Sequence, residues 1–206
     1  MTPRTRLASA ALALPFGLFA YNPMHAAAAT PAPTCAGHVA SIVISAHSPH
    51  TVRGTEHRDV VVVRDPGHVL YTGAGSDLIC GSTGHDAVHA GAGNDIVAGH
   101  AGNDTVYGNR GADTLRGNNG NDTLSGGDGD DTVSGGDGDD DLQGDDGDDS
   151  LDGGQGEDEE DGGQGSDEIT EDGDDDAQGD EDDTVIDCSS TPTADDCDDN
   201  GDSDGD

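Results

Sequence analysis

The sequence predicts an all-β solenoid of short stacked repeats rather than a globular domain with a large core. A nine-residue unit recurs eleven times without insertion between Thr72 and Thr170. Most units carry one aliphatic residue between polar neighbours, the pattern of a short strand with a single inward side chain. Glycine is abundant and aromatic residues make up only 2% of the chain, which excludes a conventional aromatic core.

The charge of the chain is strongly negative and unevenly distributed. The formal net charge is -38, and residues 117–206 contain 37 Asp or Glu with no Lys, Arg or His. Such a chain is expected neither to bind nucleic acid nor to adhere to an anionic membrane. The partners that the composition predicts are cations.

The N-terminal residues 1–28 are predicted to be a secretory signal peptide. Two early arginines precede an apolar stretch from Leu7 to Ala20, and the alanine run Ala26–Ala29 follows. The alternative is a membrane anchor, but the apolar stretch is short and contains Pro15 and Gly17. We therefore expect a secreted, extracellular protein without a membrane span.

The four cysteines form an even set, as is usual in an oxidising compartment. Cys188 and Cys197 are close enough in sequence to close a small loop, which leaves Cys35 to pair with Cys80. The two other connectivities remain open. A metal cluster is not favoured, because no CxxC spacing occurs.

The nonapeptides share three fixed positions. The fourth residue is Gly and the sixth is Asp in all eleven units, and the eighth is Val, Leu or Ile in all except the unit with Glu160. The pattern resembles the repeats-in-toxin (RTX, hemolysin-type) nonapeptide G-G-x-G-x-D-x-U-x, where U is apolar. The sixth-position residues are Asp77, Asp86, Asp95, Asp104, Asp113, Asp122, Asp131, Asp140, Asp149, Asp158 and Asp167.

The resemblance implies a right-handed parallel β-roll, a β-helix solenoid, over residues 72–170. Two nonapeptides would make one turn, with a six-residue loop and a three-residue strand whose eighth side chain points inward. The aspartates would then form two ladders with a spacing of two nonapeptides, and several Ca²⁺ ions would lie between adjacent turns. Carboxylate and carbonyl oxygens are hard donors that suit Ca²⁺ better than Mg²⁺, so the eleven aspartates are the predicted metal ligands.

Calcium is also expected to be required for folding. One buried aliphatic residue per nine offers little apolar burial against the entropy of ordering the unit, and stacked carboxylates repel one another. Metal binding is expected to supply the missing stabilisation. The alternative is a disordered acidic calcium buffer at the cell surface, without a defined roll.

The two ends of the repeat region depart from the consensus. Residues 29–71 are predicted to be a cap of degenerate repeats, with Val43, Val52, Val61 and Leu70 at the eighth position. Residues 171–206 are predicted to be a disordered acidic tail, and order is expected to fray between Asp152 and Asp187.

The end of this tail contains D-x-D-x-N-G, which resembles half of an EF-hand loop. A weak calcium site and a plain acidic tail both remain open.

No motif in the chain indicates an enzyme. H-E-x-x-H and G-x-S-x-G are absent, and residues 30–71 are too few for a catalytic domain ahead of the repeats. The histidines lack a ligand spacing and are expected at the surface. An ice-binding face is disfavoured because the seventh-position threonines would alternate between two faces. No motif identifies a macromolecular partner, so a structural or interaction role remains the predicted function.

Overall fold

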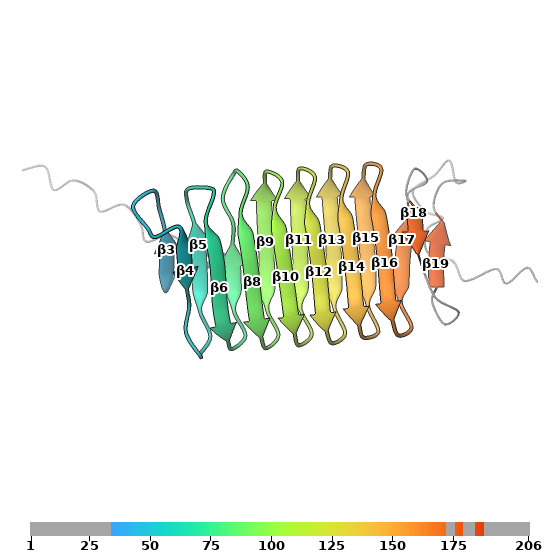
Figure 1. Cartoon of the computed structure of the whole chain (residues 1–206), viewed down its shortest axis with the longest axis horizontal. Helices are drawn as coiled ribbons and strands as arrows, with labels where there is room; N and C mark the ends of the chain where they lie inside the picture. Colours follow the sequence, from blue (N-terminus) through green and yellow to red (C-terminus); the bar gives the residue numbers. More distant parts are fainter. Residues whose placement is uncertain (1–33, 172–175, 179–183, 188–206) are drawn as a thin grey trace, which may run out of the picture. The chain divides into compact units, whose positions relative to one another are not determined.

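The computed structural model describes residues 34–171, 176–178 and 184–187, which form strands and turns without any helix. Two parallel sheets run along the stack and enclose the core between them (Figure 1). The nine-stranded sheet contains β3 (Ile42–Ile44), β5 (Val60–Val63), β7 (Leu78–Cys80), β9 (Ile96–Ala101), β11 (Thr114–Asn119), β13 (Thr132–Asp137), β15 (Ser150–Gln155), β17 (Glu168–Glu171) and β19 (Thr184–Asp187). The eight-stranded sheet contains β4 (Thr51–Arg53), β6 (Val69–Ala74), β8 (Ala87–Ala92), β10 (Thr105–Arg110), β12 (Thr123–Asp128), β14 (Asp141–Asp146), β16 (Glu159–Gln164) and β18 (Asp176–Gln178).

Consecutive strands alternate between the two sheets, so each turn of the solenoid contains two nonapeptides. In β11 and β13, Leu115 pairs with Val133, and in β10 and β12, Val106 pairs with Leu124. The partners in both pairs lie two nonapeptides apart in the sequence, as two repeats per turn require. The parallel β-roll predicted from the repeat is therefore confirmed.

The strands are longer than the sequence prediction. Most of those between β6 and β16 have six residues and include positions one to three of the next unit, whereas the expected strand covered only positions seven to nine. The turn is reduced to three residues, such as 111–113 between β10 and β11. Small residues at position one allow this extension, because that position also faces the interior between the sheets.

The core is a single file of aliphatic side chains between the sheets. The ten eighth-position aliphatics between Ile79 and Ile169 are all buried, each exposing 2% or less of its surface. The cluster comprises Ile44, Val61, Val63, Leu70, Ile79, Val88, Ala90, Val97, Val106, Leu115, Leu124, Val133, Leu142, Leu151 and Ile169. Their neighbours in the same strands alternate toward solvent, as expected for a pleated strand.

The fourth-position glycine is required by both conformation and space. Gly129, for example, has a φ of +133°, a region that side chains other than glycine rarely adopt. A Cβ atom there would also collide with the carbonyl oxygen of Gly111 one turn away, at 2.5 Å. The turns can stack this closely only because both positions lack a side chain.

The first turn differs from the prediction for Val43. In β3 and β5, Ile42 pairs with Val61, a separation one residue longer than two nonapeptides, so one extra residue lies between β3 and β4. Val43 is consequently 40% exposed, and Ile44 is fully buried in the core.

The predicted disulfide between Cys35 and Cys80 is present. It ties β1 (Thr34–Cys35) to β7, and β1 pairs with β2 (His38–Val39) in a small antiparallel sheet. Cys188 and Cys197 lie outside the described residues.

Pairing at the other end continues through the region expected to fray. Glu159 of β16 pairs with Asp176 of β18, and Glu168 of β17 pairs with Thr184 of β19. Both separations are shorter than two nonapeptides. The nine-residue register does slip after Thr170, as predicted, but the shorter units still add strands to both sheets. The half EF-hand loop lies outside the described residues.

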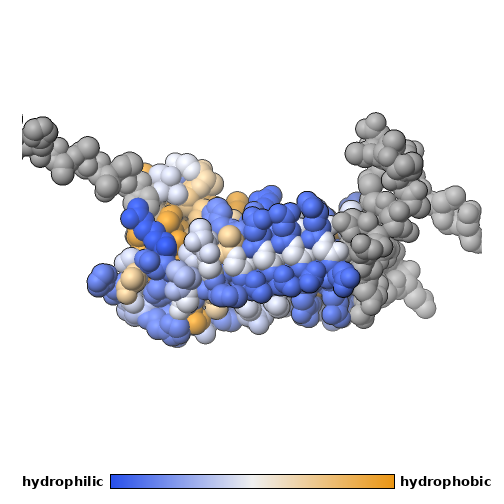
Figure 2. Space-filling view, turned by 90° about the horizontal axis from the view of Figure 1, so that it is seen from above, coloured by the Kyte–Doolittle hydropathy of each residue, from blue (hydrophilic) through white to orange (hydrophobic). Residues whose placement is uncertain are grey.

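The surface is predominantly hydrophilic, with apolar side chains gathered toward the N-terminal turns (Figure 2). Among the described residues, the large exposed hydrophobic ones are Val39, Val43, Ile96 and Tyr107. A helix long and apolar enough to cross a bilayer is absent from the described ranges. The seventh-position threonines pair only as Thr105 with Thr123 and Thr114 with Thr132, two on each sheet, as predicted.

Candidate metal centre

The eleven predicted ligands all lie at the end of a turn, immediately before the next strand begins. Their side chains are buried, with exposures of 5% or less. The short turn explains this position, because the glycine two residues earlier reverses the chain and directs the aspartate inward. These carboxylates are therefore not part of the solvated surface charge.

The aspartates form two continuous ladders along the roll. The backbone N–H of Asp95 donates to Oδ1 of Asp113 at 2.7 Å, and that of Asp113 donates to Oδ1 of Asp131 at 2.7 Å. The second ladder has the same geometry, with the N–H of Asp122 donating to Oδ1 of Asp140 at 2.7 Å. The first ladder contains Asp77, Asp95, Asp113, Asp131, Asp149 and Asp167, and the second contains Asp86, Asp104, Asp122, Asp140 and Asp158.

One carboxylate oxygen of each aspartate between Asp77 and Asp149 is buried and accepts no hydrogen bond within the described part of the chain. This oxygen is Oδ1 in Asp86 and Oδ2 in the others. A buried polar atom without a partner costs roughly 1–3 kcal/mol, more when charged. A row of such atoms indicates that another species is to be bound there.

A main-chain oxygen lies near each of several of these carboxylates. A Cβ atom added to Gly108 would collide with Oδ2 of Asp113. It would also lie 2.5 Å from the carbonyl oxygen of Gly126 in the next turn. The same pairing of a carboxylate and a glycyl carbonyl recurs at Gly99, Gly117, Gly135 and Gly144. Glycine at position one thus lets hard oxygen donors from adjacent turns approach each other, which fits the ligand preference of Ca²⁺.

The electrostatics of the ladders favour proton or cation binding. Burial raises the pKa of Asp95, Asp104, Asp122, Asp131 and Asp140 to about 6, and hydrogen bonding to a backbone N–H partly offsets this rise. Burial likewise raises the pKa of Asp113 and Asp149 to about 7, with added repulsion from neighbouring aspartates. The buried carboxylates therefore carry charge at neutral pH only at a cost.

Asp59 continues the first ladder but lacks the unsatisfied oxygen. Its backbone N–H donates to Oδ1 of Asp77 at 2.7 Å. Its own Oδ2 accepts from the N–H of Thr55 at 2.8 Å, and its Oδ1 accepts from the hydroxyl of Ser41 at 3.3 Å. The protein itself therefore satisfies this carboxylate, which separates Asp59 from the ladder aspartates between Asp77 and Asp149.

Glu160 occupies the core position of its unit, as the sequence implies, and is fully buried. Its Oε1 accepts a hydrogen bond from the N–H of Gly153 at 2.7 Å, and in the sheet it pairs with Leu142. The unit is thus retained in the roll despite its carboxylate. This turn therefore contains a buried acid in the core, Glu160, in addition to the buried ladder aspartate.

The residues that sequence reasoning missed are those of an aromatic stack on the outer face of the eight-stranded sheet. The His89 ring stacks between Tyr71 and Tyr107, with centroid distances of 4.5 and 4.8 Å. His89 was expected at the surface, and it lies in β8, partly buried between the two tyrosine rings. The regular spacing of these three ninth-position residues, two nonapeptides from one to the next, was the available signal.

The described ranges contain no group of three or more His, Cys, Asp or Glu side chains arranged to hold a metal ion. Within each ladder, a carboxylate lies next to the ladder aspartates one turn before and one turn after it. An ion at these positions would therefore need main-chain oxygens to complete its coordination.

Regular turns, fourth-position glycines and buried aspartate ladders define a parallel β-roll of nonapeptide repeats. The RTX calcium-binding nonapeptide repeat matches the chain in four overlapping copies, at residues 71–106, 81–115, 107–142 and 134–169. Residues 71–169, just under half of the chain, therefore carry RTX nonapeptide repeats, and these repeats imply calcium binding within the roll. Neither the curated proteins nor the solved structures gave a match.

Proposed function

We propose that this chain is an extracellular calcium-binding protein whose roll folds when calcium neutralises the two aspartate ladders, and that it has a structural or interaction role. The observation that carries the proposal is the row of buried carboxylate oxygens without hydrogen-bond partners. Without a cation, these oxygens oppose folding through desolvation and mutual repulsion. Several bound Ca²⁺ ions would turn the same oxygens into inter-turn links.

The eleven aspartates are proposed as the ligands. Asp158 and Asp167 belong to the last two units, next to the region where the nine-residue pattern ends. Residues 72–170 would be the calcium-binding part, and residues 29–71 a cap that the Cys35–Cys80 disulfide holds against it. Residues 1–28 would direct export, and residues 171–206 would form the acidic tail. We propose no catalytic activity, since RTX β-rolls are generally structural.

The test is far-ultraviolet circular dichroism of the full mature chain in calcium and in excess chelator, with magnesium as the ion control. We expect a β signal in calcium, and a spectrum of a disordered chain in chelator and in magnesium. An unchanged β signal in chelator would refute calcium-coupled folding. A disordered spectrum in all three conditions would instead support the acidic-buffer alternative.

Matched variants separate ladder binding from general charge effects. One variant replaces Asp104, Asp122 and Asp140 with Asn, and its control replaces the exposed Asp130, Asp139 and Asp148 with Asn. Both variants remove three carboxylates, and Asp139 of the control lies in the same turn as Asp140. The ladder variant is expected to need far more calcium to fold, and the control is expected to titrate nearly as the original chain. Equal behaviour of the two variants would contradict the ligand assignment.

A further inference from the structure

The aromatic stack on β6, β8 and β10 ends differently on its two sides. The guanidinium carbon of Arg53 lies 4.9 Å from the centroid of the Tyr71 ring, so a cation covers the first ring. His89 follows, and Tyr107 is the last ring among the described residues. Burial lowers the pKa of His89, so this ring is neutral at neutral pH and the stack carries charge only at its Arg53 end.

Beyond Tyr107, the ladder of large side chains stops at a serine. Tyr107 of β10 pairs with Ser125 of β12, where a further ring would otherwise stand. A hollow of about 500 Å³ opens at this point, and Tyr107 remains 36% exposed. The outer side of the last ring is thus accessible from solvent.

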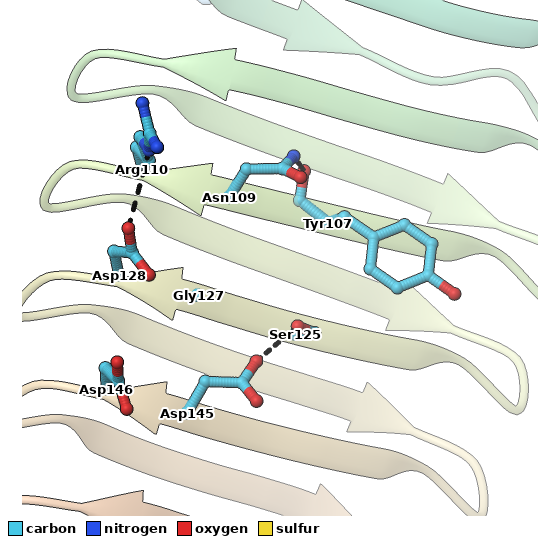
Figure 3. Close-up of a pocket in the computed structure, with 8 residues that line it drawn as sticks. All are labelled: Tyr107, Asn109, Arg110, Ser125, Gly127, Asp128, Asp145 and Asp146. Atoms are coloured by element: carbon cyan, nitrogen blue, oxygen red, sulfur yellow. Dashed lines mark hydrogen bonds and ion pairs between the residues drawn. The ribbon is translucent and has the colours of Figure 1, made fainter.

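Carboxylates gather around this hollow, as Figure 3 shows. Asp145 accepts a hydrogen bond from the Ser125 hydroxyl at 2.5 Å, and Asp128 and Asp146 line the same space. The one cation in the lining, Arg110, is paired with Asp128 at 3.5 Å. The remaining charge of the hollow is therefore negative.

We infer that this hollow, lined by Tyr107, Ser125 and Asp145, receives the guanidinium group of an arginine on a basic peptide segment of a partner protein. The chain already uses this contact at the other end of the same stack, where Arg53 covers Tyr71. A planar cation stacks on a tyrosine face and donates hydrogen bonds to carboxylates. Charge complementarity favours it over a neutral sugar, for which the surrounding carboxylates add no attraction. This inference goes beyond the proposed calcium function and requires only that the roll is folded.

The test uses the calcium-loaded full chain, with tyrosine ring signals followed by NMR in about 150 mM salt to suppress nonspecific attraction. The probe is an acetylated and amidated Gly-Arg-Gly peptide, and the same peptide with neutral citrulline is its control. We expect the Tyr107 signals to shift and those of Tyr71 to stay, because Arg53 already covers Tyr71. Replacing Tyr107 with Leu should weaken binding about threefold.

Charge variants provide the second control. Asp145→Asn should weaken the peptide about twofold, whereas Asp152→Asn, an equal charge change at an exposed residue of β15, should leave its affinity unchanged. Equal effects of these two variants, equal shifts of both tyrosines, or binding of the citrulline peptide would overturn the inference. A larger Tyr107 shift with methyl glucoside than with the arginine peptide would assign the hollow to a sugar instead. Dichroism of each sample reports folding separately, so a folded chain with unmoved Tyr107 refutes this inference alone.

Discussion

Calcium binding to an unfolded chain and to a preformed roll would release different numbers of protons. In the folded roll, the pKa values of five ladder aspartates are about 6, and those of Asp113 and Asp149 are about 7. In an unfolded chain, these groups return to the ordinary value of 3.8 and are ionised at pH 6.5. A preformed roll would therefore release about three protons per chain when calcium binds at about pH 6.5, and an unfolded chain almost none.

The assay is calorimetric calcium titration in two buffers of different ionisation enthalpy at that pH. Calcium-coupled folding predicts the same binding enthalpy in both buffers, with less than about one proton released. The Asp113→Asn variant is the control, because the Asp113 carboxyl would be one of the two largest proton donors in a preformed roll. A release of about three protons, falling by nearly one in this variant, would refute folding coupled to calcium.

Three further predictions concern pH, the core and the disulfide. Because the folded pKa of the ladder carboxyls is raised, their contribution to stability is full below pH 3.8 and is lost as the pH rises through about 6–7. The calcium-free chain should therefore gain β signal by dichroism as the pH falls from about 7.5 to 4. A chain that stays monomeric by sedimentation but shows no such gain would contradict the pKa shifts. Glu160→Leu should raise the free energy of unfolding of the calcium-loaded chain in urea by about 2 kcal/mol, because it buries an aliphatic side chain and removes a buried carboxyl. The control Glu159→Leu, at an exposed residue, should not raise it, and equal effects of the two variants would count against the burial argument. Reduction of Cys35–Cys80, which spans 45 residues, should cost up to about 4 kcal/mol in the same assay, whereas an unchanged urea midpoint would show that the clamp adds nothing.

The regular part of the roll could be predicted because its physical determinants are local and repeated. Each unit carries its own glycine for the turn, its own aspartate and its own aliphatic residue, and the pairing of every second unit was what the family resemblance implied. The burial of Leu115 and Leu124 and the arrangement of the aspartates in two ladders were expected for these reasons, whereas the hydrogen bonds that link the ladder residues were not.

Features that depend on contacts between turns were harder to predict. The extra residue before β4 moved Val43 out of the core, because a degenerate unit does not reveal where an insertion lies. Strand length was underestimated, since positions one to three contain glycine and acidic residues that have low strand propensity but pair well within a stack. The ring stack at His89 depends on neighbours one full turn away, which a reading along the chain overlooks.

The most direct test of the central claim is a crystal structure of the calcium-loaded chain, with anomalous scattering used to locate the ions. The account predicts ions between adjacent turns, each contacting the carboxylate oxygen of a ladder aspartate that has no hydrogen-bond partner, such as Oδ2 of Asp113 or Asp122. Ions found only beside exposed carboxylates such as Asp130 and Asp139, with the ladder oxygens uncoordinated, would contradict it.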